Sequence, residues 1–83
     1  MTEYAVVVFS STFGAIRAQK ALEDAVPFQV MPVPREISAG CGISLRLSPA
    51  DVPAARDALS GTELSPDEYA FYAMPGGGRL SNP

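Results

Sequence analysis

The chain contains a single cysteine, Cys41, with a glycine directly on each side of it, Gly40 and Gly42. Its thiolate form is the nucleophile of thiol chemistry, and it reacts only where it is accessible. The segment 32–42 separates stretches of regular apolar pattern, and loops held between such elements commonly contain functional residues. We therefore predict that Cys41 is a presented, reactive thiol. The alternative is that Cys41 packs as a small buried hydrophobe, as many free cysteines do.

Polar residues of the same segment are candidates for assisting the thiol. Arg35 is expected to contact an anionic group beside Cys41, and Glu36 or Ser38 to orient the thiol. Arg35 and Glu36 are equally compatible with a solvated surface pair. The flanking glycines either allow a close approach of the backbone to a ligand or partner, or form the turn of a hairpin.

Hydrophobic periodicity and helix caps predict six regular elements. The first strand is apolar at every position, which indicates burial on both faces. The second strand ends at two prolines and is expected at a sheet edge. In the third strand Ser44 and Arg46 are expected to face solvent. The predicted strands are 4–9, 28–31, 42–47 and 67–74, and the predicted helices are 13–26 and about 51–60.

This order, β-α-β-β-α-β, predicts a ferredoxin-like α+β sandwich. It has a four-stranded antiparallel sheet with both helices on one face. We expect a single domain over residues 1–74, and a disordered tail rich in glycine and proline over residues 75–83.

The predicted topology gives Cys41 a position. In a strand-helix-strand unit the two strands run in the same direction, so both end at the same rim of the sheet. The 32–42 loop and the amino end of the first helix, with Ser11 and Thr12, should therefore share one edge. A helix amino end favours anions, which would stabilise a thiolate at Cys41. Ser11 and Thr12 are predicted first as helix caps and second as anion ligands.

One string of residues is distinctive: Pro34-Arg35-Glu36-Ile37-Ser38-x-x-Cys41-Gly42. A second string, Phe9-x-Ser11-Thr12-x-x-Ala15, leads into the first helix. With these residues, and from about Tyr4 to Tyr72, the chain resembles the selenium/sulfur carrier protein-like family. The resemblance implies a thiol carrier that holds sulfur or selenium as a persulfide-type adduct on Cys41, with sulfur or selenium donor and acceptor proteins as partners.

Composition excludes several classes of protein. The 83 residues have a formal charge of −3, which argues against nucleic acid or an anionic membrane as partner. One cysteine and no histidine exclude an internal disulfide and argue against zinc, and we expect no cofactor. We expect a cytoplasmic location, because a lone thiol suits a reducing compartment and neither a signal peptide nor a membrane span is evident.

Two other functions remain open from the sequence. The Cys41 loop and the first helix could grip a small anion in a non-catalytic regulatory module. An exposed sheet face or edge strand could instead dock a partner in an interaction subunit, including a second copy in a homodimer. Without a histidine, a metal cluster or a carboxylate pair near Cys41, the sequence favours a carrier over an enzyme.

Overall fold

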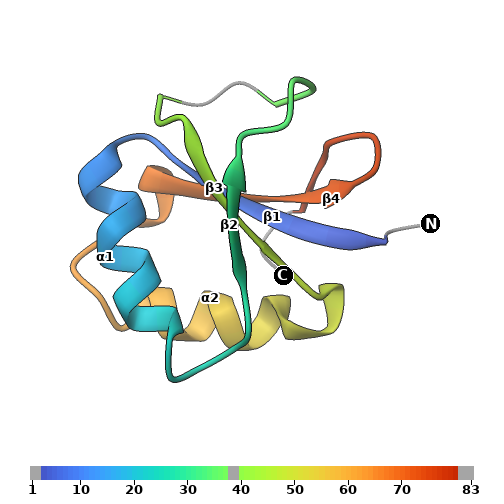
Figure 1. Cartoon of the computed structure of the whole chain (residues 1–83). Helices are drawn as coiled ribbons and strands as arrows, with labels where there is room; N and C mark the ends of the chain where they lie inside the picture. Colours follow the sequence, from blue (N-terminus) through green and yellow to red (C-terminus); the bar gives the residue numbers. More distant parts are fainter. Residues whose placement is uncertain (1–2, 38–39, 81–83) are drawn as a thin grey trace.

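The computed structural model describes residues 3–37 and 40–80 of the chain. Within these ranges the strands are β1 (Tyr4–Phe9), β2 (Gln29–Pro32), β3 (Ile43–Leu47), β4 (Tyr69–Met74) and β5 (Gly78–Leu80). The helices are α1 (Thr12–Leu22) and α2 (Val52–Ser60), with short 3-10 turns η1 (Pro49–Asp51) and η2 (Pro66–Glu68). Figure 1 shows their arrangement.

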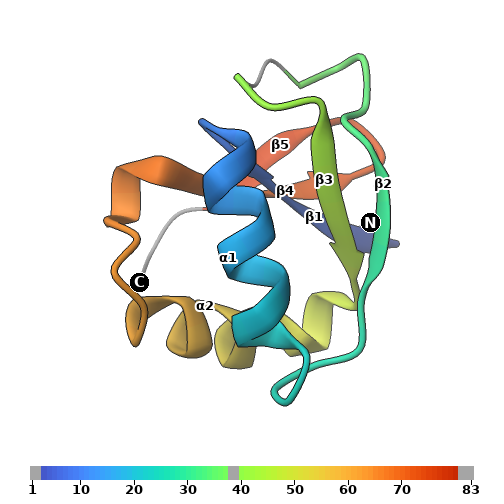
Figure 2. The same ribbon diagram turned by 60° about the vertical axis from the view of Figure 1, so that its left-hand side comes forward.

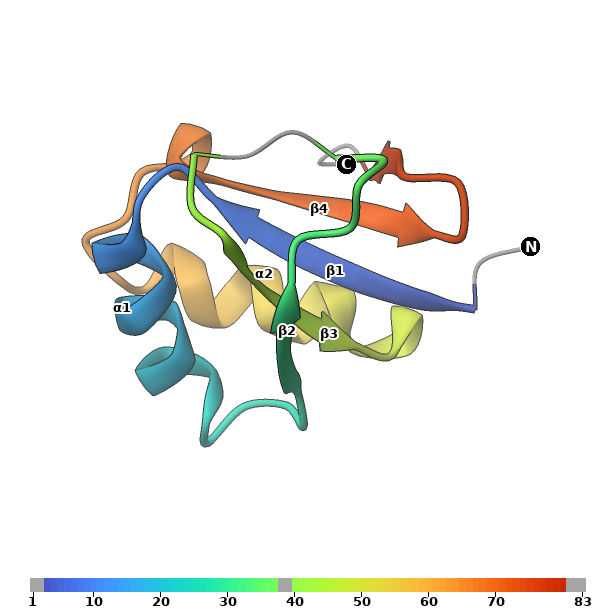
Figure 3. The same ribbon diagram turned by 45° about the horizontal axis from the view of Figure 1, so that its top comes forward.

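The five strands form one antiparallel sheet in the order β2-β3-β1-β4-β5. Both helices pack on one face of this sheet, as the core contacts show and as Figure 3 displays from a side view. The predicted α+β class, the antiparallel pairing and the edge position of β2 are confirmed. The predicted number of four strands is wrong, because a fifth strand extends the sheet beyond β4.

Strand β1 lies at the centre of the sheet and is buried on both faces, as predicted. On the helix face, Ala5, Val7 and Phe9 pack against the apolar stripes of α1 and α2. The largest buried side chains of the two helices are Leu22 of α1 and Leu59 of α2, both completely buried. Burial of such side chains contributes about 1.5–3 kcal/mol each, so this layer supplies much of the stability.

The second face of the sheet is covered by the chain segment between β2 and β3. Ile37 of that segment is buried against Val6 and Val8 of β1 and Met74 of β4. The loop therefore acts as a second covering layer over the sheet.

This covering layer explains why one expectation for β3 is wrong. Ser44 was expected to face solvent, but it is completely buried. Its hydroxyl lies 3.2 Å from the carbonyl oxygens of Met31 and Pro32, and it can donate to either. Arg46 does face outward, and its guanidinium lies 4.1 Å from the centre of the Tyr4 ring. Alternation along a strand cannot reveal a loop that later folds over its polar face.

Helix α1 begins where its caps predict and ends earlier than expected. The Ser11 hydroxyl accepts a hydrogen bond from the Gly14 amide at 3.1 Å, so Ser11 is the N-cap. The helix ends at Leu22, four residues before Val26, and Ala25 beyond it is exposed. Because Pro27 disfavours a helical residue before it, the chain leaves the helix in a turn and returns toward β2.

The segment predicted as a disordered tail is ordered over part of its length. Gly76 and Gly77 have positive φ angles of 102° and 74° and form the turn between β4 and β5. Strand β5 then pairs with β4 through Ala73↔Gly78, Tyr72↔Arg79 and Phe71↔Leu80. Figure 2 shows β5 beside β4. The glycines that suggested disorder instead make this tight reversal possible.

Strand β5 is also fixed to the helix layer. Leu80 packs against the helix-side core, and the Arg56 guanidinium of α2 donates to the Leu80 carbonyl oxygen at 2.6 Å. The same guanidinium lies over the Phe71 ring, 4.7 Å from its centre. None of the helices in the described part of the chain is long and apolar enough to cross a bilayer.

These contacts predict that β5 contributes to stability. Deletion of residues 75–83 should lower the free energy of unfolding by about 2 kcal/mol, because it removes Leu80 burial, ladder bonds and the Arg56 contact. Urea denaturation of the truncated and full chains measures this difference. Equal stability of the two chains would contradict an ordered β5.

Candidate functional site

Cys41 is held at the end of β1 and beside the start of α1. Its amide donates to the carbonyl oxygen of Phe9, the last residue of β1, at 3.2 Å. Its side chain belongs to the helix-side core and has an exposed fraction of only 3%. The prediction that the thiol is presented to solvent is therefore wrong for this conformation. Its reactivity stays a prediction.

The predicted proximity of Cys41 to the amino end of α1 is confirmed. The Cys41 Sγ atom lies 3.8 Å from Oγ1 of Thr12, the first residue of α1, a distance at which either can donate a hydrogen bond to the other. Thr12 itself is exposed at this end of the helix. The buried thiol of Cys41 therefore contacts the hydroxyl of an exposed residue. Such a hydroxyl can donate to a thiolate and stabilise it.

The two glycines beside Cys41 have different roles. A Cβ atom at Gly40 would lie 2.5 Å from the carbonyl oxygen of Ser10, so only glycine allows the loop to approach the β1–α1 junction this closely. A Cβ atom at Gly42 would meet no other atom within 4 Å. Gly40 thus allows a close approach, but to the chain's own backbone; the predicted approach to a ligand or partner stays a prediction.

Arg35 and Glu36, the charged residues of the motif, lie in a separate turn of the loop. Arg35 and Glu36 are the central residues of a turn closed by a 3.0 Å hydrogen bond from the Ile37 amide to the Pro34 carbonyl oxygen. Both side chains are exposed. The Cβ atom of Glu36 lies beside Gly77, in the turn between β4 and β5.

The structure thus divides the predicted site into two parts. Cys41, Gly40 and Thr12 come together at the end of β1, with Ser11 as the cap of the same helix end. Arg35 and Glu36 are not brought to the thiol, since no contact joins either residue to Cys41 within the described residues. Ser38 lies outside the described residues. Sequence reasoning missed Ser10, whose carbonyl the loop packs against, because a backbone acceptor leaves no trace in residue type.

Across the part of the chain that the structure describes, no three His, Cys, Asp or Glu side chains gather in a way that could hold a metal ion. The site brings together one sheltered thiol, a neighbouring hydroxyl and a helix amino end.

Comparison with known proteins agrees with the family resemblance. A family model described as "Putative Se/S carrier protein-like" matches residues 3–70. The chain belongs to this family. The match includes Cys41, Thr12 and the whole of the loop, and it ends before Phe71, so β5 lies outside it. Searches of curated proteins and of solved structures returned no match.

The geometry at the two glycines predicts opposite effects of the same substitution. Gly40→Ala should destabilise the protein by about 1–3 kcal/mol, because the new methyl group forces the loop away from the Ser10 carbonyl. It should also speed the reaction of Cys41 with iodoacetamide, since the displaced loop uncovers the thiol. Urea denaturation and alkylation followed by intact mass measure the two effects.

Gly42→Ala is the matched control, because its methyl group enters open space. Its stability should be unchanged or raised by about 0.4–1 kcal/mol, and its alkylation rate should equal that of the wild type. The close-approach interpretation fails if the two variants behave alike.

Proposed function

We propose that this protein carries sulfur or selenium as a persulfide-type adduct on Cys41 and passes it between partner proteins. The observation that supports this most directly is the position of the only cysteine in a chain of this family. Its sulfur lies against the Thr12 hydroxyl at the amino end of α1. No other side chain in the sequence offers a thiol for such an adduct.

The transfer step needs no cofactor. The Cys41 thiolate attacks the terminal sulfur of a donor persulfide and forms a new S–S bond, while the S–S bond of the donor breaks. The donor cysteine leaves as a thiolate, and the proton of the Cys41 thiol passes to solvent. The sulfur atom moves with its oxidation state unchanged, and selenium follows the same course. Thr12 and the helix amino end stabilise the charged sulfur before and after transfer.

Burial of Cys41 gives the carrier two states. In the closed state the thiol has an exposed fraction of 3%, and an adduct there is sheltered from water and from small thiols. Transfer requires an opening of the segment around Gly40, which is joined to β1 by the Cys41–Phe9 hydrogen bond and by its contact with Ser10. Local opening of this segment costs less than global unfolding, because it leaves the helices and the rest of the sheet in place.

The carrier proposal predicts a specific adduct. After incubation with glutathione persulfide, the intact mass of the wild type should increase by one sulfur atom, and treatment with dithiothreitol should remove it. Cys41→Ser is the control and should gain nothing. If the wild type stays unmodified while denatured protein is modified, the folded chain does not accept sulfur and the proposal is overturned.

Partner docking is the second part of the proposal, and α1 offers a surface for it. Phe13 and Ile16 follow Thr12 on the outward face of the helix and have exposed fractions of 65% and 54%. Large apolar side chains exposed side by side are typical of contact sites. We propose that the donor protein covers Phe13 and Ile16, because this places its persulfide at the end of the helix where Cys41 lies.

The double variant Phe13→Ser/Ile16→Ser tests this surface. Sulfur transfer from a persulfide-bearing cysteine desulfurase should slow by about tenfold, whereas the rate with glutathione persulfide should not change. Val30→Ser is the control, since Val30 is 55% exposed on the edge strand β2. Equal slowing with both donors would show damage to the thiol site, and no slowing with either would remove α1 as the docking face.

Finer features belong to the same proposal. We propose that the first four strands and two helices form a ferredoxin-like βαββαβ unit, to which β5 is added; the order β2-β3-β1-β4 supports this.

A cytoplasmic location is supported by the lone thiol. Homodimer formation and regulation by a small anion stay predictions. The anion hypothesis has lost support, because Arg35 lies in a turn separate from the helix end.

A further inference from the structure

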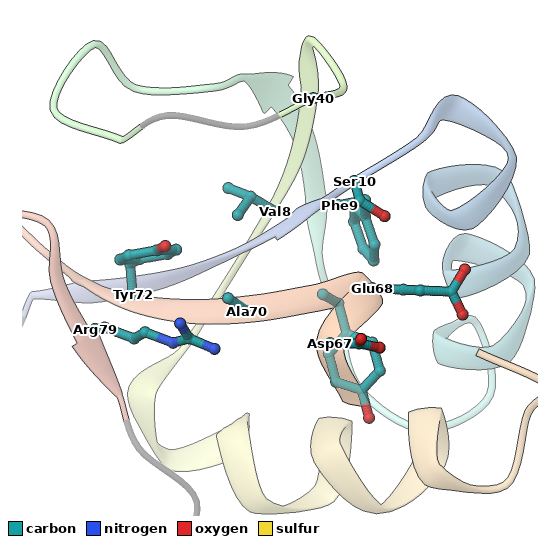
Figure 4. A pocket seen from close by; sticks show the side chains of 10 residues that line it. Val8, Phe9, Ser10, Gly40, Asp67, Glu68, Ala70, Tyr72 and Arg79 are labelled. Atoms are coloured by element: carbon teal, nitrogen blue, oxygen red, sulfur yellow. The ribbon is translucent and has the colours of Figure 1, made fainter. Parts of the chain in front are cut away.

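A cavity of about 220 Å³ lies on the face of the sheet that the helices leave free. Val8 of β1 and Ala70 and Tyr72 of β4 line it, and Gly40 of the loop closes one side. Figure 4 shows these residues with Arg79 of β5. We call this space the Arg79 cavity. It is smaller than the pockets of about 300–1,000 Å³ that hold drug-sized ligands, so any ligand is small.

The cavity carries opposite charges on two sides. Arg79 pairs with Tyr72 in the sheet, whereas Asp67 precedes the start of β4, so Ala70 lies between them along the strand. Figure 4 shows Arg79 and Asp67 on either side of Ala70. Among the described residues the only salt bridge joins Arg17 and Glu63, so Arg79 and Asp67 do not neutralise each other.

Neither charged side chain has all of its hydrogen-bonding groups paired with other described residues. The Arg79 guanidinium makes no hydrogen bond or ion pair to another described residue. Asp67 accepts one hydrogen bond, from the Ser65 hydroxyl to Oδ1 at 2.7 Å, and its Oδ2 oxygen has no such partner among the described residues. Glu68 also lines the cavity, but its Oε2 oxygen accepts from the Ser65 amide at 2.7 Å and completes the cap of η2.

We infer that the Arg79 cavity binds a small apolar α-amino acid, whose carboxylate pairs with Arg79 and whose ammonium group meets Asp67. A cation and an anion that face one cavity without meeting are complementary to a zwitterion. A guanidinium binds a carboxylate through two parallel hydrogen bonds, and the free Asp67 oxygen accepts from an ammonium group. Val8 and Ala70 offer the apolar surface for the side chain.

The second cavity of the described chain shows why Arg79 is distinctive. That cavity, of about 420 Å³, is lined by Arg46 and Tyr4, and there the guanidinium already lies over the tyrosine ring at 4.1 Å. Arg46 therefore already has a cation–π partner, whereas the Arg79 guanidinium has no such contact among the described residues. Arg46→Gln removes the same charge from the same face of the sheet and serves as the matched control.

The test is a titration of the full-length, ¹⁵N-labelled protein with L-leucine, followed by amide chemical shifts. Saturable shifts are expected at Val8, Ala70 and Tyr72. Two analogues each lack one charge: 4-methylpentanoate lacks the ammonium group and 3-methylbutylamine lacks the carboxylate. Each should bind about tenfold more weakly than leucine, or worse, since each forfeits one charge-assisted contact.

Variants assign the contacts. Arg79→Gln should weaken leucine binding by about tenfold and leave binding of 3-methylbutylamine unchanged. Asp67→Asn should also weaken leucine binding by about tenfold, but it should leave binding of 4-methylpentanoate unchanged. Arg46→Gln and Cys41→Ser should bind leucine like the wild type. Asp57→Asn, an exposed change on α2, is the control for loss of an acid.

Three outcomes would overturn the inference: absence of saturable shifts at millimolar leucine, unchanged binding in Arg79→Gln, or equal binding of leucine and 4-methylpentanoate. The last would indicate a site for carboxylates alone. Because Cys41 takes no part in this binding, failure of the amino-acid site leaves the carrier proposal untouched, and failure of the carrier proposal leaves this site standing.

Discussion

The approach of Gly40 to the Ser10 carbonyl is the contact on which this domain depends. It allows the Cys41 amide to reach the Phe9 carbonyl, and so fixes the loop between β2 and β3 to the end of β1. With that end fixed, Ile37 can cover Val6 and Val8. Without the loop, the central strand would expose one apolar face to water, since both helices pack on the other. One glycine thus connects the folding of the sheet with the placement of the thiol.

The proposed carrier needs a cysteine that is both packed and functional, and that connection offers a way to combine the two. Free cysteines are commonly buried and inert, and burial at 3% exposure would ordinarily favour a structural role for Cys41. Here the buried sulfur lies one residue from the loop's closest contact and touches a helix-end hydroxyl. In the proposed carrier, this sulfur is sheltered while the loop contacts β1, and a local opening of the loop exposes it. A carrier needs both conditions, because an adduct that is always exposed reacts with any thiol.

Sequence reasoning found what local chemistry determines. The Ser11 cap, the burial of β1, the edge position of β2 and the meeting of Cys41 with the first helix follow from residue type and from the direction of the crossover. It failed where a distant segment decides the environment. Ser44 was expected to face solvent because the sequence of β3 gives no sign of the loop that covers it. Strand β5 was missed because Gly76 and Gly77 are equally typical of a turn and of a disordered tail.

The motif shows that residues close together in the sequence can lie in different regions of the folded molecule. Arg35 and Cys41 are six positions apart and were expected side by side, yet the Pro34–Ile37 turn sends the charged pair toward Gly77 while Gly40 returns to Ser10. The two ends of one motif therefore serve two regions of the molecule. The region with Cys41 lies within the family match, whereas Arg79 lies beyond it. Gly40 borders both the thiol and the Arg79 cavity, so any ligand that favours the seated loop must, by linkage, also reduce exposure of Cys41.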